Sequence, residues 1–418
     1  MRTDAAVRVA EKTLERADTI ILGGGLVGLT LALALDAHGL SSIVVDPAEP
    51  ADVLARGFDG RASAVASASH HMLDAIGIGA RLAGQGCPIH SIKVSDGLTP
   101  RSLLFDADPA SGPLGVMYEN RLLRRTLHEA AAEAANVTLL MPAVPAKVER
   151  DAASARVTLA DGRTFAAGLV IGAEGRNSPS RAAAGINVAR WSYDHTAIIA
   201  TLGHARPHGG VAHEIFYPSG PFALLPMLDD DQGPRSAIVW TVAGRHGAAM
   251  LGLPDRAFLA EAEKGMGGLL GPLRSVSPRS SYPLGFHHTA RITAERLALV
   301  GDAGHGIHPI AGQGLNLGFR DVAALAEVLV EGARLGLDMG DAQLLARYER
   351  WRALDSFLVA ATTDGLTRLF GLPGRTPRAI RRFGLDMVGR IPPLKRAFMA
   401  EARGESGALP KLLQGMEV

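Results

Sequence analysis

The fold of this chain is decided by residues 19–46, which read TIILGGGLVGLTLALALDAHGLSSIVVD. A short apolar run ends at Leu22, glycines follow, a long apolar stretch reaches Gly39, and a second apolar run ends at Asp46. This order predicts a strand, a tight turn, a buried helix that ends at Gly39, and a second strand. The glycines, with an acid about 20 residues after them, are the signature of a β-α-β unit that binds a dinucleotide. Asp46 would accept hydrogen bonds from the ribose of an adenosine.

Each glycine of this turn is expected to have its own task. Gly23 permits the tight turn, Gly25 lets a pyrophosphate approach the backbone, and Gly28 lets the helix and the strand pack closely. The helix begins at Leu26 and Val27, where free N–H groups and the helix dipole favour negative charge. The sequence therefore predicts a phosphate site at the start of this helix.

A second glycine-rich stretch, residues 301–318, reads GDAGHGIHPIAGQGLNLG and leads from an apolar strand into a helical pattern. Asp302, at the start of the loop, can accept a hydrogen bond from a sugar-like hydroxyl. The amides of Gly314, Leu315 and Asn316 lie at the start of the next helix and can hydrogen-bond an electron-rich ring oxygen. A flavin offers both ribityl hydroxyls and a pyrimidine carbonyl, whereas a nicotinamide cofactor lacks this combination. The two motifs together predict a single cofactor held from both sides.

The composition restricts the class of protein. With 418 residues, of which 47% are hydrophobic, the chain is long enough for two packed domains or one large α/β unit. Its 43 Lys and Arg residues balance 42 Asp and Glu residues, which argues against a protein that binds nucleic acid over its whole surface. The single cysteine, Cys87, excludes an intrachain disulfide and a thiolate metal cluster. His305 and His308 have no supporting carboxylate or cysteine cluster, so no metal is expected.

The sequence shows neither a secretion signal nor a membrane span. Residues 1–18 lack an apolar core, and no apolar run reaches about 18 residues. We therefore expect a cytoplasmic protein, with a peripheral contact to the inner face of the membrane left open. The segment 377–418 favours such a contact because it mixes basic and apolar side chains.

The order of the predicted elements indicates the architecture. A hairpin is predicted near residues 146–168, residues 61–77 look helical, and the segment 195–240 is rich in strand patterns. We expect an α/β fold in which a Rossmann-type FAD-binding domain carries an inserted, mostly antiparallel β-sheet substrate domain and a helical C-terminal region. The expected boundaries are residues 1–18 for an N-terminal extension, 19–190 and 285–345 for a discontinuous FAD-binding domain, 191–284 for the substrate domain, and 346–418 for the C-terminal helical region.

Four motifs follow one another along the chain. They are residues 23–28 with Asp46, DGRA at 59–62, AEGRNSPSR at 173–181, and the stretch 301–321, which includes HPIAGQGLNLGFRD. In this order they resemble the class A flavoprotein aromatic hydroxylases, the group that includes para-hydroxybenzoate hydroxylase. The wording of the fourth motif is most similar to the ubiquinone-biosynthesis hydroxylases, which act on polyprenylated phenols. The resemblance covers roughly residues 19–405, and it implies that the first motif holds the ADP half of FAD.

The resemblance assigns a place to further residues. Arg61 would lie near the pyrophosphate and the path of the nicotinamide, and Arg121 would contact the flavin from its helix. Asp302 would bind the ribityl chain. Pro309 would lie by the reactive edge of the isoalloxazine, with His308 beside it on the substrate side, and these two are the residues expected at the reaction centre.

The third motif departs from the family pattern at Glu174, where aspartate is usual. Glutamate keeps the charge but reaches one methylene further. Because this loop is thought to serve both FAD and NAD(P)H, the change bears mainly on the handling of the pyridine nucleotide. In the fourth motif, the amides of Leu315 and Asn316 would face the pyrimidine carbonyl of the flavin.

The substrate is expected to meet the β-rich segment. Its apolar side chains would suit the entrance for a polyprenyl chain, although the same side chains also suit the core of a sheet. The substrate residues predicted on this basis are Phe216, Phe222, Leu224 and Pro226.

The resemblance implies an FAD-dependent monooxygenase that hydroxylates the aromatic ring of a polyprenylated phenol in ubiquinone biosynthesis. It would use NAD(P)H and O2 through a C4a-hydroperoxyflavin, and the sequence names no catalytic base. Three alternatives stay open: a flavin hydroxylase of a soluble aromatic compound, a flavin-dependent reductase or halogenase of related fold, and a catalytically degenerate FAD-binding subunit of a biosynthetic complex. The sequence lacks the Trp-x-Trp-x-Ile-Pro segment expected of a halogenase. The expected partners are a prenylated aromatic substrate, the membrane surface and a ubiquinone-biosynthesis complex, and no nucleic acid.

Overall fold

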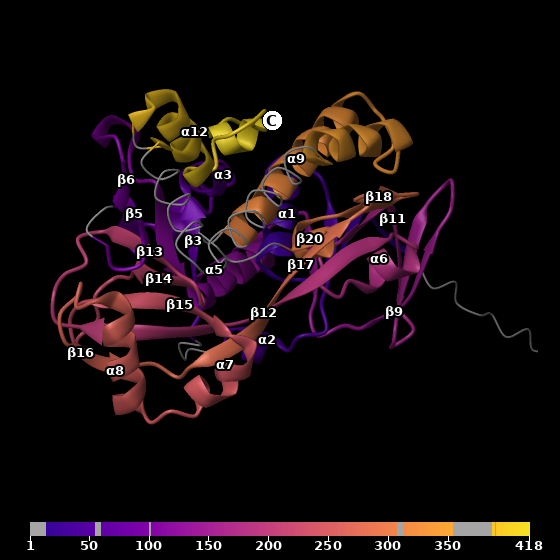
Figure 1. Ribbon diagram of the computed structural model, residues 1–418. Helices are drawn as coiled ribbons and strands as arrows, with labels where there is room; N and C mark the ends of the chain where they lie inside the picture. The colour runs from indigo at the N-terminus through magenta and orange to yellow at the C-terminus, as the bar shows by residue number, and fades with distance from the viewer. Residues whose placement is uncertain (1–13, 55–59, 100–101, 307–312, 354–386, 389) are drawn as a thin grey trace, which may run out of the picture.

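Two large sheets, joined by a long central helix, make up the molecule (Figure 1). The computed structural model describes residues 14–54, 60–99, 102–306, 313–353, 387–388 and 390–418.

The first sheet has eight strands and a parallel centre. Its main order is β18-β19-β11-β1-β2-β8, with β10 beside β11 and β9 beside β10. The strands β19, β11, β1, β2 and β8 run parallel, as the predicted β-α-β unit requires. The bounds are β1 Glu15–Leu22, β2 Ser42–Val45, β8 Val137–Leu140, β9 Pro145–Arg150, β10 Ala155–Leu159, β11 Thr164–Gly172, β18 Thr293–Ala294 and β19 Leu297–Leu299.

Three helices pack around this parallel centre: α1 (Leu26–Asp36), α5 (Asn120–Glu133) and α9 (Gln313–Arg334). The helix α1 is apolar on all sides and buried from Gly28 to Leu35, because it packs against the sheet and against both other helices. The helix α9 crosses the centre of the molecule from the outer end of the first sheet toward the second sheet (Figure 1). Its first residues therefore lie where the two sheets approach each other.

The predicted hairpin is confirmed. The strands β10 and β11 are antiparallel on either side of the turn at Asp161 and Gly162, and β9 adds a third strand. The strand β11 then continues to Gly172 as a parallel neighbour of β1, so that one strand serves both the hairpin and the parallel centre.

The second sheet has nine strands and is mostly antiparallel. Its order is β20-β17-β12-β15-β14-β13-β5-β6, with β16 beside β12. It takes β5 and β6 from residues 91–106, which we assigned to the first domain, because β5 pairs in parallel with the distant strand β13. The bounds are β5 Ser91–Asp96, β6 Ser102–Asp106, β12 Val188–His204, β13 Val211–Tyr217, β14 Gly220–Pro226, β15 Arg235–Ala243, β16 Leu273–Val276, β17 Ser280–Thr289 and β20 His305–Gly306.

A small antiparallel sheet of β3 (Ala62–Ala66), β7 (Gly115–Glu119) and β4 (Cys87–Ile89) lies between the large sheets. The prediction of one helix over residues 61–77 was wrong, since residues 62–66 pair with β7 and the helix α3 begins only at Ser67. Long-range pairing overrides the weak helical pattern of this small-residue stretch.

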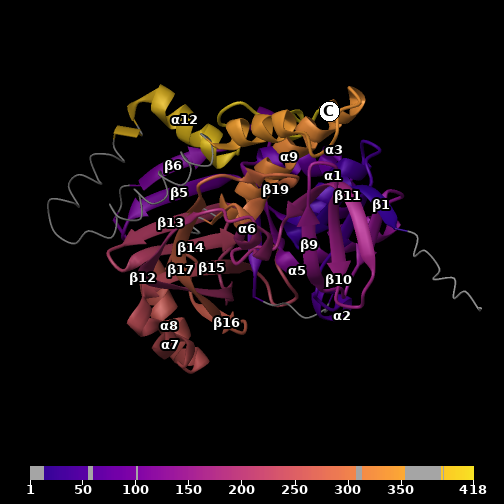
Figure 2. The same cartoon turned by 90° about the vertical axis from the view of Figure 1, so that its right-hand side faces the viewer.

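The remaining helices cover the outside. In the second view, α7 and α8 lie under the second sheet, and α12 lies at the top of the molecule (Figure 2). Residues 342–353 are also helical, and Tyr348 Oη donates a 2.8 Å hydrogen bond to the carbonyl oxygen of Leu299. The bounds are α2 Pro50–Val53, α3 Ser67–Ala75, α4 Gly79–Leu82, α6 Pro179–Ala183, α7 Gly244–Leu251, α8 Asp255–Met266 and α12 Pro392–Ala402, with 3-10 turns at η1 Pro109–Ser111, η2 Gly301–Ala303 and η4 Lys411–Gln414.

Candidate active site

The turn between β1 and α1 has no room for a side chain at two of its glycines. A Cβ at Gly23, where φ is +112°, would lie 2.4 Å from the carbonyl oxygen of Ala173, and a Cβ at Gly28 would lie 1.9 Å from that of Gly23. A Cβ at Gly25, by contrast, would meet no atom within 4 Å. Open space therefore lies above Gly25 at the start of α1, where the N–H groups from Leu26 onward favour an anion.

Val27 joins the first motif to the fourth. A Cβ at Gly301 would lie 3.2 Å from a methyl group of Val27, and a Cβ at Gly318 would lie 2.8 Å from the same methyl group. The two glycines thus let the loop after β19 and the helix α9 close on Val27. The two glycine-rich motifs are in direct contact, as a cofactor held from both sides requires.

Asp46 follows β2, and its carboxylate is fixed over the glycine turn. The backbone N–H of Gly24 donates to Oδ2 at 2.6 Å, and that of Ala48 donates to Oδ1 at 2.8 Å. Each carboxylate oxygen has a second lone pair, so both retain the capacity to accept from ribose hydroxyls.

Glu174 lies between β11 and α6, and its carboxylate is used within its own loop. It accepts hydrogen bonds from Ser178 Oγ at 2.5 Å and from Ser180 Oγ at 2.6 Å. The longer side chain therefore closes the loop of the third motif on itself.

Arg181 connects the third motif to the fourth. Its buried guanidinium donates to the carbonyl oxygen of Ala303 at 2.8 Å and to that of Arg176 at 2.7 Å. The loops that carry Glu174 and Asp302 therefore keep a fixed distance from each other.

Asp302 lies deep in the molecule, yet its side chain is exposed to open space. The surrounding protein removes enough water to raise the pKa of its carboxyl group, although Arg176 and His305 act in the opposite direction. The backbone at Asp302 is fixed because its carbonyl oxygen lies 2.8 Å from His287 Nε2, in hydrogen-bond contact. An acceptor in this position can bind the hydroxyl groups of a polyol chain.

The start of α9 is held against β3 by Asn316. Its amide group donates to the carbonyl oxygen of Ala64 and accepts from the N–H of Ala66, both at 2.9 Å. The side chain of Asn316 is thus used for this contact, and its backbone, with those of Gly314 and Leu315, belongs to the first turn of the helix. The first N–H groups of a helix have no acceptor within the helix, so they can bind a ring oxygen.

Sequence reasoning missed Asn120, which lies beside Arg61. The backbone N–H of Asn120 donates to the carbonyl oxygen of Arg61 at 3.0 Å, and its Oδ1 accepts from Ser63 Oγ at 2.7 Å. Asn120 is the first residue of α5, directly after the N-cap residue Glu119, and nothing in the sequence indicates its contact with Ser63, which lies 57 residues earlier.

Sequence reasoning also missed Tyr282 on β17, since a tyrosine in a β-rich segment carries no signal. Burial raises the pKa of its hydroxyl group, while Arg176 and Arg61 lower it and Asp302 raises it. These electrostatic effects place Tyr282 close to the second, third and fourth motifs. The hydroxyl group of Tyr282 therefore lies within electrostatic range of Arg61, Arg176 and Asp302, which belong to these motifs.

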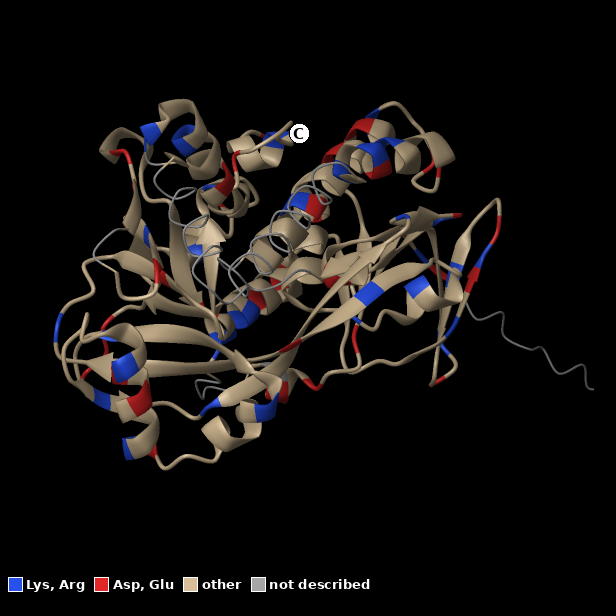
Figure 3. Cartoon of the chain, viewed as in Figure 1, with Lys and Arg blue, Asp and Glu red and all other residues tan. Residues whose placement is uncertain are grey.

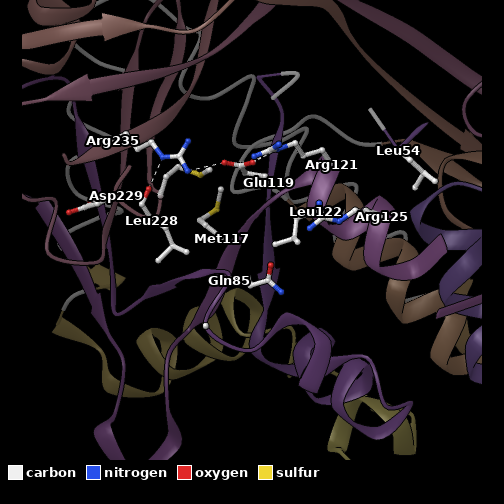
Figure 4. Close-up of a pocket in the computed structure, with 12 residues that line it drawn as sticks. Leu54, Gln85, Met117, Glu119, Arg121, Leu122, Arg125, Leu228, Asp229 and Arg235 are labelled. Carbon is white, nitrogen blue, oxygen red and sulfur yellow. Dashed lines mark hydrogen bonds and ion pairs between the residues drawn. The ribbon is translucent and has the colours of Figure 1, made fainter. Parts of the chain in front are cut away.

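Arg121, in the first turn of α5, is paired with a carboxylate of β7. Its Nε donates to Glu119 at 2.5 Å, and Arg235 of β15 donates to the other oxygen of Glu119 at 2.8 Å. Figure 4 shows these side chains in a row along a pocket of about 330 Å³, with Arg125 and Leu54 on its far side. A contact of Arg121 with the flavin stays a prediction, whereas its contact with Glu119 joins α5 to the second sheet.

The predicted substrate residues lie on two different faces of the second sheet. Neighbouring residues of a strand point to opposite faces, and Phe222 and Leu224 pack in the core that includes Phe258 of α8. Pro226 has the same parity, whereas Phe216 lies on the face away from α8. Phe222 and Leu224 are therefore core residues, and a substrate role is kept only for Phe216. Pro309 and His308 lie outside the described residues.

The arrangement fits FAD. It offers an open helix N-terminus above Gly25 for the pyrophosphate, a fixed carboxylate at Asp46 for a ribose, and an accessible acid at Asp302 for the ribityl chain. The start of α9 supplies amides for the ring. All four features belong to one continuous region, since Val27 contacts both motifs.

Comparison with known proteins agrees with this geometry. The family model described as "FAD binding domain" matches residues 16–359. The ubiquinone hydroxylase UbiL of Rhodospirillum rubrum is 46% identical over 403 residues, which cover 96% of this chain and 93% of that protein. The chain belongs to the FAD-binding monooxygenase family that includes the ubiquinone hydroxylases.

One further relative supports this membership, and one solved structure shares the fold. The human mitochondrial ubiquinone biosynthesis monooxygenase COQ6 is 30% identical to this monooxygenase over 435 residues, which cover 92% of each chain. The crystal structure of p-nitrophenol 4-monooxygenase PnpA from Pseudomonas putida DLL-E4 has a TM-score of 0.78 and 18% identity, covering 95% of this chain and all of that one. The last comparison shows a shared fold. FAD is accordingly the cofactor of this monooxygenase.

Proposed function

We propose that this monooxygenase hydroxylates the aromatic ring of a polyprenylated phenol in ubiquinone biosynthesis, with NAD(P)H as electron donor and O2 as oxidant. The observation that carries the proposal is the 46% identity to a ubiquinone hydroxylase over almost the whole chain. The two-sided site for a flavin supports it, because ring hydroxylation needs a cofactor that stores two electrons and activates oxygen.

The protein contributes position and exclusion of water. FAD, when bound, supplies the electron storage and the oxygen activation. Gly25 and the start of α1 hold its pyrophosphate, Asp46 holds a ribose, and Asp302 holds the ribityl chain. The amides at the start of α9 stabilise negative charge on the ring. The face of the second sheet that carries Phe216 and Tyr282 covers the substrate side.

A visible spectrum of the purified protein is the first test. We expect flavin absorption, followed by bleaching with NADH or NADPH in the absence of oxygen, and faster bleaching when a prenylated phenol is present. In air, mass spectrometry should find a product that contains one additional oxygen atom.

Other outcomes would contradict the proposal in recognisable ways. Bands that neither nucleotide bleaches would indicate a degenerate subunit or another electron donor. Equal turnover of phenols with and without a prenyl chain would favour a hydroxylase of soluble aromatic compounds.

A peripheral contact with the membrane is part of the proposal, because a polyprenyl chain resides in lipid. Among the described residues, no helix is both long and apolar enough to span a bilayer. The helix α12, at the upper left of Figure 3, combines basic residues with exposed apolar ones, as interfacial helices do. This surface consists of Met387, Ile391 and Phe398, each 38–41% exposed, with Arg390, Lys395 and Arg396.

Flotation with anionic liposomes tests this contact. The double variant Lys395→Glu, Arg396→Glu should lose at least about 10-fold in binding, because each basic residue near such a surface contributes about 1 kcal/mol. The variant Lys147→Glu, on β9, is the control for charge. Equal flotation of all three proteins, or no flotation of the wild type at low salt, would contradict the contact. Assembly with other enzymes of the pathway stays a prediction.

A further inference from the structure

The second sheet presents two different faces. On one face, Phe222 and Ile238 form a core with Phe258 of α8. The pairing of the strands places Phe216, opposite Pro221 and Asp96, on the other face. We call this other face the flavin-side face, for the reasons that follow.

The flavin-side face is turned toward the FAD-binding part of the molecule. At one end, Tyr282 lies close enough to Arg61, Arg176 and Asp302 for their charges to act on its hydroxyl group. Further along, Ala212 of this face packs with Met117 of β7 in one apolar cluster. The face therefore covers both the predicted flavin site and the small sheet beside it.

Glu214 lies on the flavin-side face, two residues before Phe216. Its neighbours in the sheet are Val94 on β5 and Ala223 on β14, both apolar and without large side chains. The residue is only 7% exposed. An acid in such a place is rare in a folded protein unless it is paired or has a function.

No described side chain neutralises Glu214. Among the described residues, it has no hydrogen bond or ion pair, and its titration responds to burial alone. Lys93 and His213 are opposite each other on the far face of the sheet, and Asp96 is the neighbouring acid of the flavin-side face. The thiol of Cys87, in the apolar cluster packed against this face, is neutral because burial raises its pKa to about 11.

The carboxyl group is nevertheless not sealed in the core. Among the described residues, several side-chain polar atoms are wholly enclosed and have no hydrogen-bond partner, and Thr241 Oγ1 in this sheet is one of them. Neither carboxylate oxygen of Glu214 belongs to this group. Its oxygens therefore keep contact with accessible space on the flavin-side face.

We propose that Glu214 is the general base that accepts the phenolic proton of the substrate. In this step the O–H bond of the phenol breaks, the proton goes to a carboxylate oxygen of Glu214, and the electron pair stays on the phenolic oxygen. The resulting phenolate is a stronger carbon nucleophile at the ring positions beside that oxygen. When the hydroxylated ring regains its aromatic state, the ring carbon that gained the oxygen loses its proton to water, and Glu214 returns its own proton to the phenolic oxygen. The proposal rests on the proposed function, because it assumes a phenolic substrate.

The protonation equilibrium of Glu214 is suited to this exchange. Burial raises the pKa of its carboxyl group to about 8. A base is most effective when its pKa lies near the working pH. The raised pKa of Glu214 also reduces the difference between its own pKa and that of a phenol, which is near 10. Tyr282, by comparison, is already a phenol with a raised pKa, so it is a poorer acceptor.

The test uses the FAD-loaded enzyme and a short-chain prenylated phenol, with Glu214→Gln and Glu214→Asp. Glutamine keeps the shape of the side chain but cannot accept the proton, and aspartate restores the carboxylate. We expect Glu214→Gln to form hydroxylated product about 100-fold more slowly, the lower range for loss of a general base. Glu214→Asp should recover part of the rate. Glu261→Gln, on the exposed side of α8, is the matched control and should behave as wild type.

A second measurement does not depend on turnover. The near-ultraviolet difference spectrum of the bound phenol separates phenol from phenolate, and in oxidised wild-type enzyme the phenolate should appear as the pH rises. In Glu214→Gln this transition should move down by at least 1 pH unit, roughly a 10-fold change in the proton equilibrium, because the phenolate no longer forms beside a carboxylate. An unchanged transition together with an unchanged rate would overturn the proposal.

The two proposals fail in different ways. A wild type that binds the phenol but does not hydroxylate it would overturn the proposed function, and the spectral titration would then decide the role of Glu214 alone. A wild type that binds no phenol would overturn both. A slow Glu214→Gln whose phenol ionises as in wild type would also overturn the assignment of a base.

Discussion

At the scale of single residues, Asp321 organises the region behind the flavin site. It is fully buried and accepts from the N–H of Gly301 at 2.8 Å and from Arg352 Nε at 2.7 Å, and His305 Nε2 lies 2.7 Å from it. Burial would raise the pKa of Asp321, but His305 and Arg352 outweigh it and hold the pKa below its usual range. One carboxylate thus fixes the loop that carries Asp302 to the C-terminal region.

Replacing Asp321 with Asn should lower the free energy of unfolding by about 3–5 kcal/mol, because the buried ion pair between Asp321 and Arg352 is then broken. Since the folded pKa is depressed, the stabilisation is present above the unfolded pKa of about 3.9 and is lost as the pH falls below it. Urea unfolding at pH 7 and FAD titration check this. The control is Asp231→Asn in the exposed turn after β14. Equal midpoints for both variants would show that Asp321 is dispensable.

Glu214 should affect the pH dependence of protein stability as well as catalysis. Its folded pKa of about 8 lies above that of an unfolded glutamic acid, about 4.3, so the folded state holds a proton that the unfolded state has lost. The contribution of Glu214 to the free energy of unfolding is therefore complete below about pH 4.3. It decreases as the pH rises to about 8, by at most about 1.4 kcal/mol per pH unit. Glu214→Gln should lack this slope. Urea unfolding of both proteins between about pH 5 and about pH 8 checks this prediction. A difference in unfolding free energy between wild type and variant that stays the same at every pH would refute it.

At the scale of elements, local sequence predicted what depends on local geometry. The turn from β1 to α1 was predicted in full, because the roles of Gly23 and Gly28 follow from steric contacts within the unit itself. The pairing of β5 with β13 was not predictable, since nothing in residues 91–96 indicates a partner more than 100 residues away. Roles for Tyr282 and Glu214 were not predictable either, because they depend on the face of the sheet on which each residue lies. Phe222 and Leu224 were misassigned because an apolar residue in a strand does not show which face is the core.

Two glycines of one turn should respond differently to alanine. Gly25→Ala meets no protein atom within 4 Å, so the fold should be kept while FAD binds at least about 10-fold more weakly, because the methyl group occupies the phosphate space. Gly28→Ala would place Cβ 1.9 Å from a carbonyl oxygen, so the protein itself should be destabilised by several kcal/mol, as roughly expected for strain in a packed core. FAD titration and thermal unfolding of the apoprotein separate the two effects. The same loss of stability in both variants would contradict this assignment.

At the scale of the whole molecule, Glu119 holds two parts together. Its side chain is 12% exposed and lies between Arg121 of α5 and Arg235 of β15, which flank it in Figure 4. The bond from Arg235 to Glu119 spans 116 residues of sequence, and with Arg121 it links the helix beside the first sheet to a central strand of the second sheet. The orientation of the two sheets therefore depends in part on one carboxylate.

Glu119→Gln should lower the free energy of unfolding by about 1–3 kcal/mol, because two hydrogen bonds to charged groups are weakened. Faster proteolysis between the two sheets should accompany the loss. Glu129→Gln, farther along α5 and exposed, is the control. Unchanged proteolysis of Glu119→Gln would show that the apolar contacts alone set the orientation.

The strand order also has a consequence for biosynthesis. The first sheet is completed only when β19 reaches β11, and the second only when β20 reaches β17, so both wait for residues 297–306. Until this stretch leaves the ribosome, each sheet presents an unpaired edge of the kind that invites aggregation. A nascent chain stalled before residue 297 should therefore depend on chaperones, whatever the supply of FAD, and riboflavin starvation should harm the protein only after synthesis has passed that point.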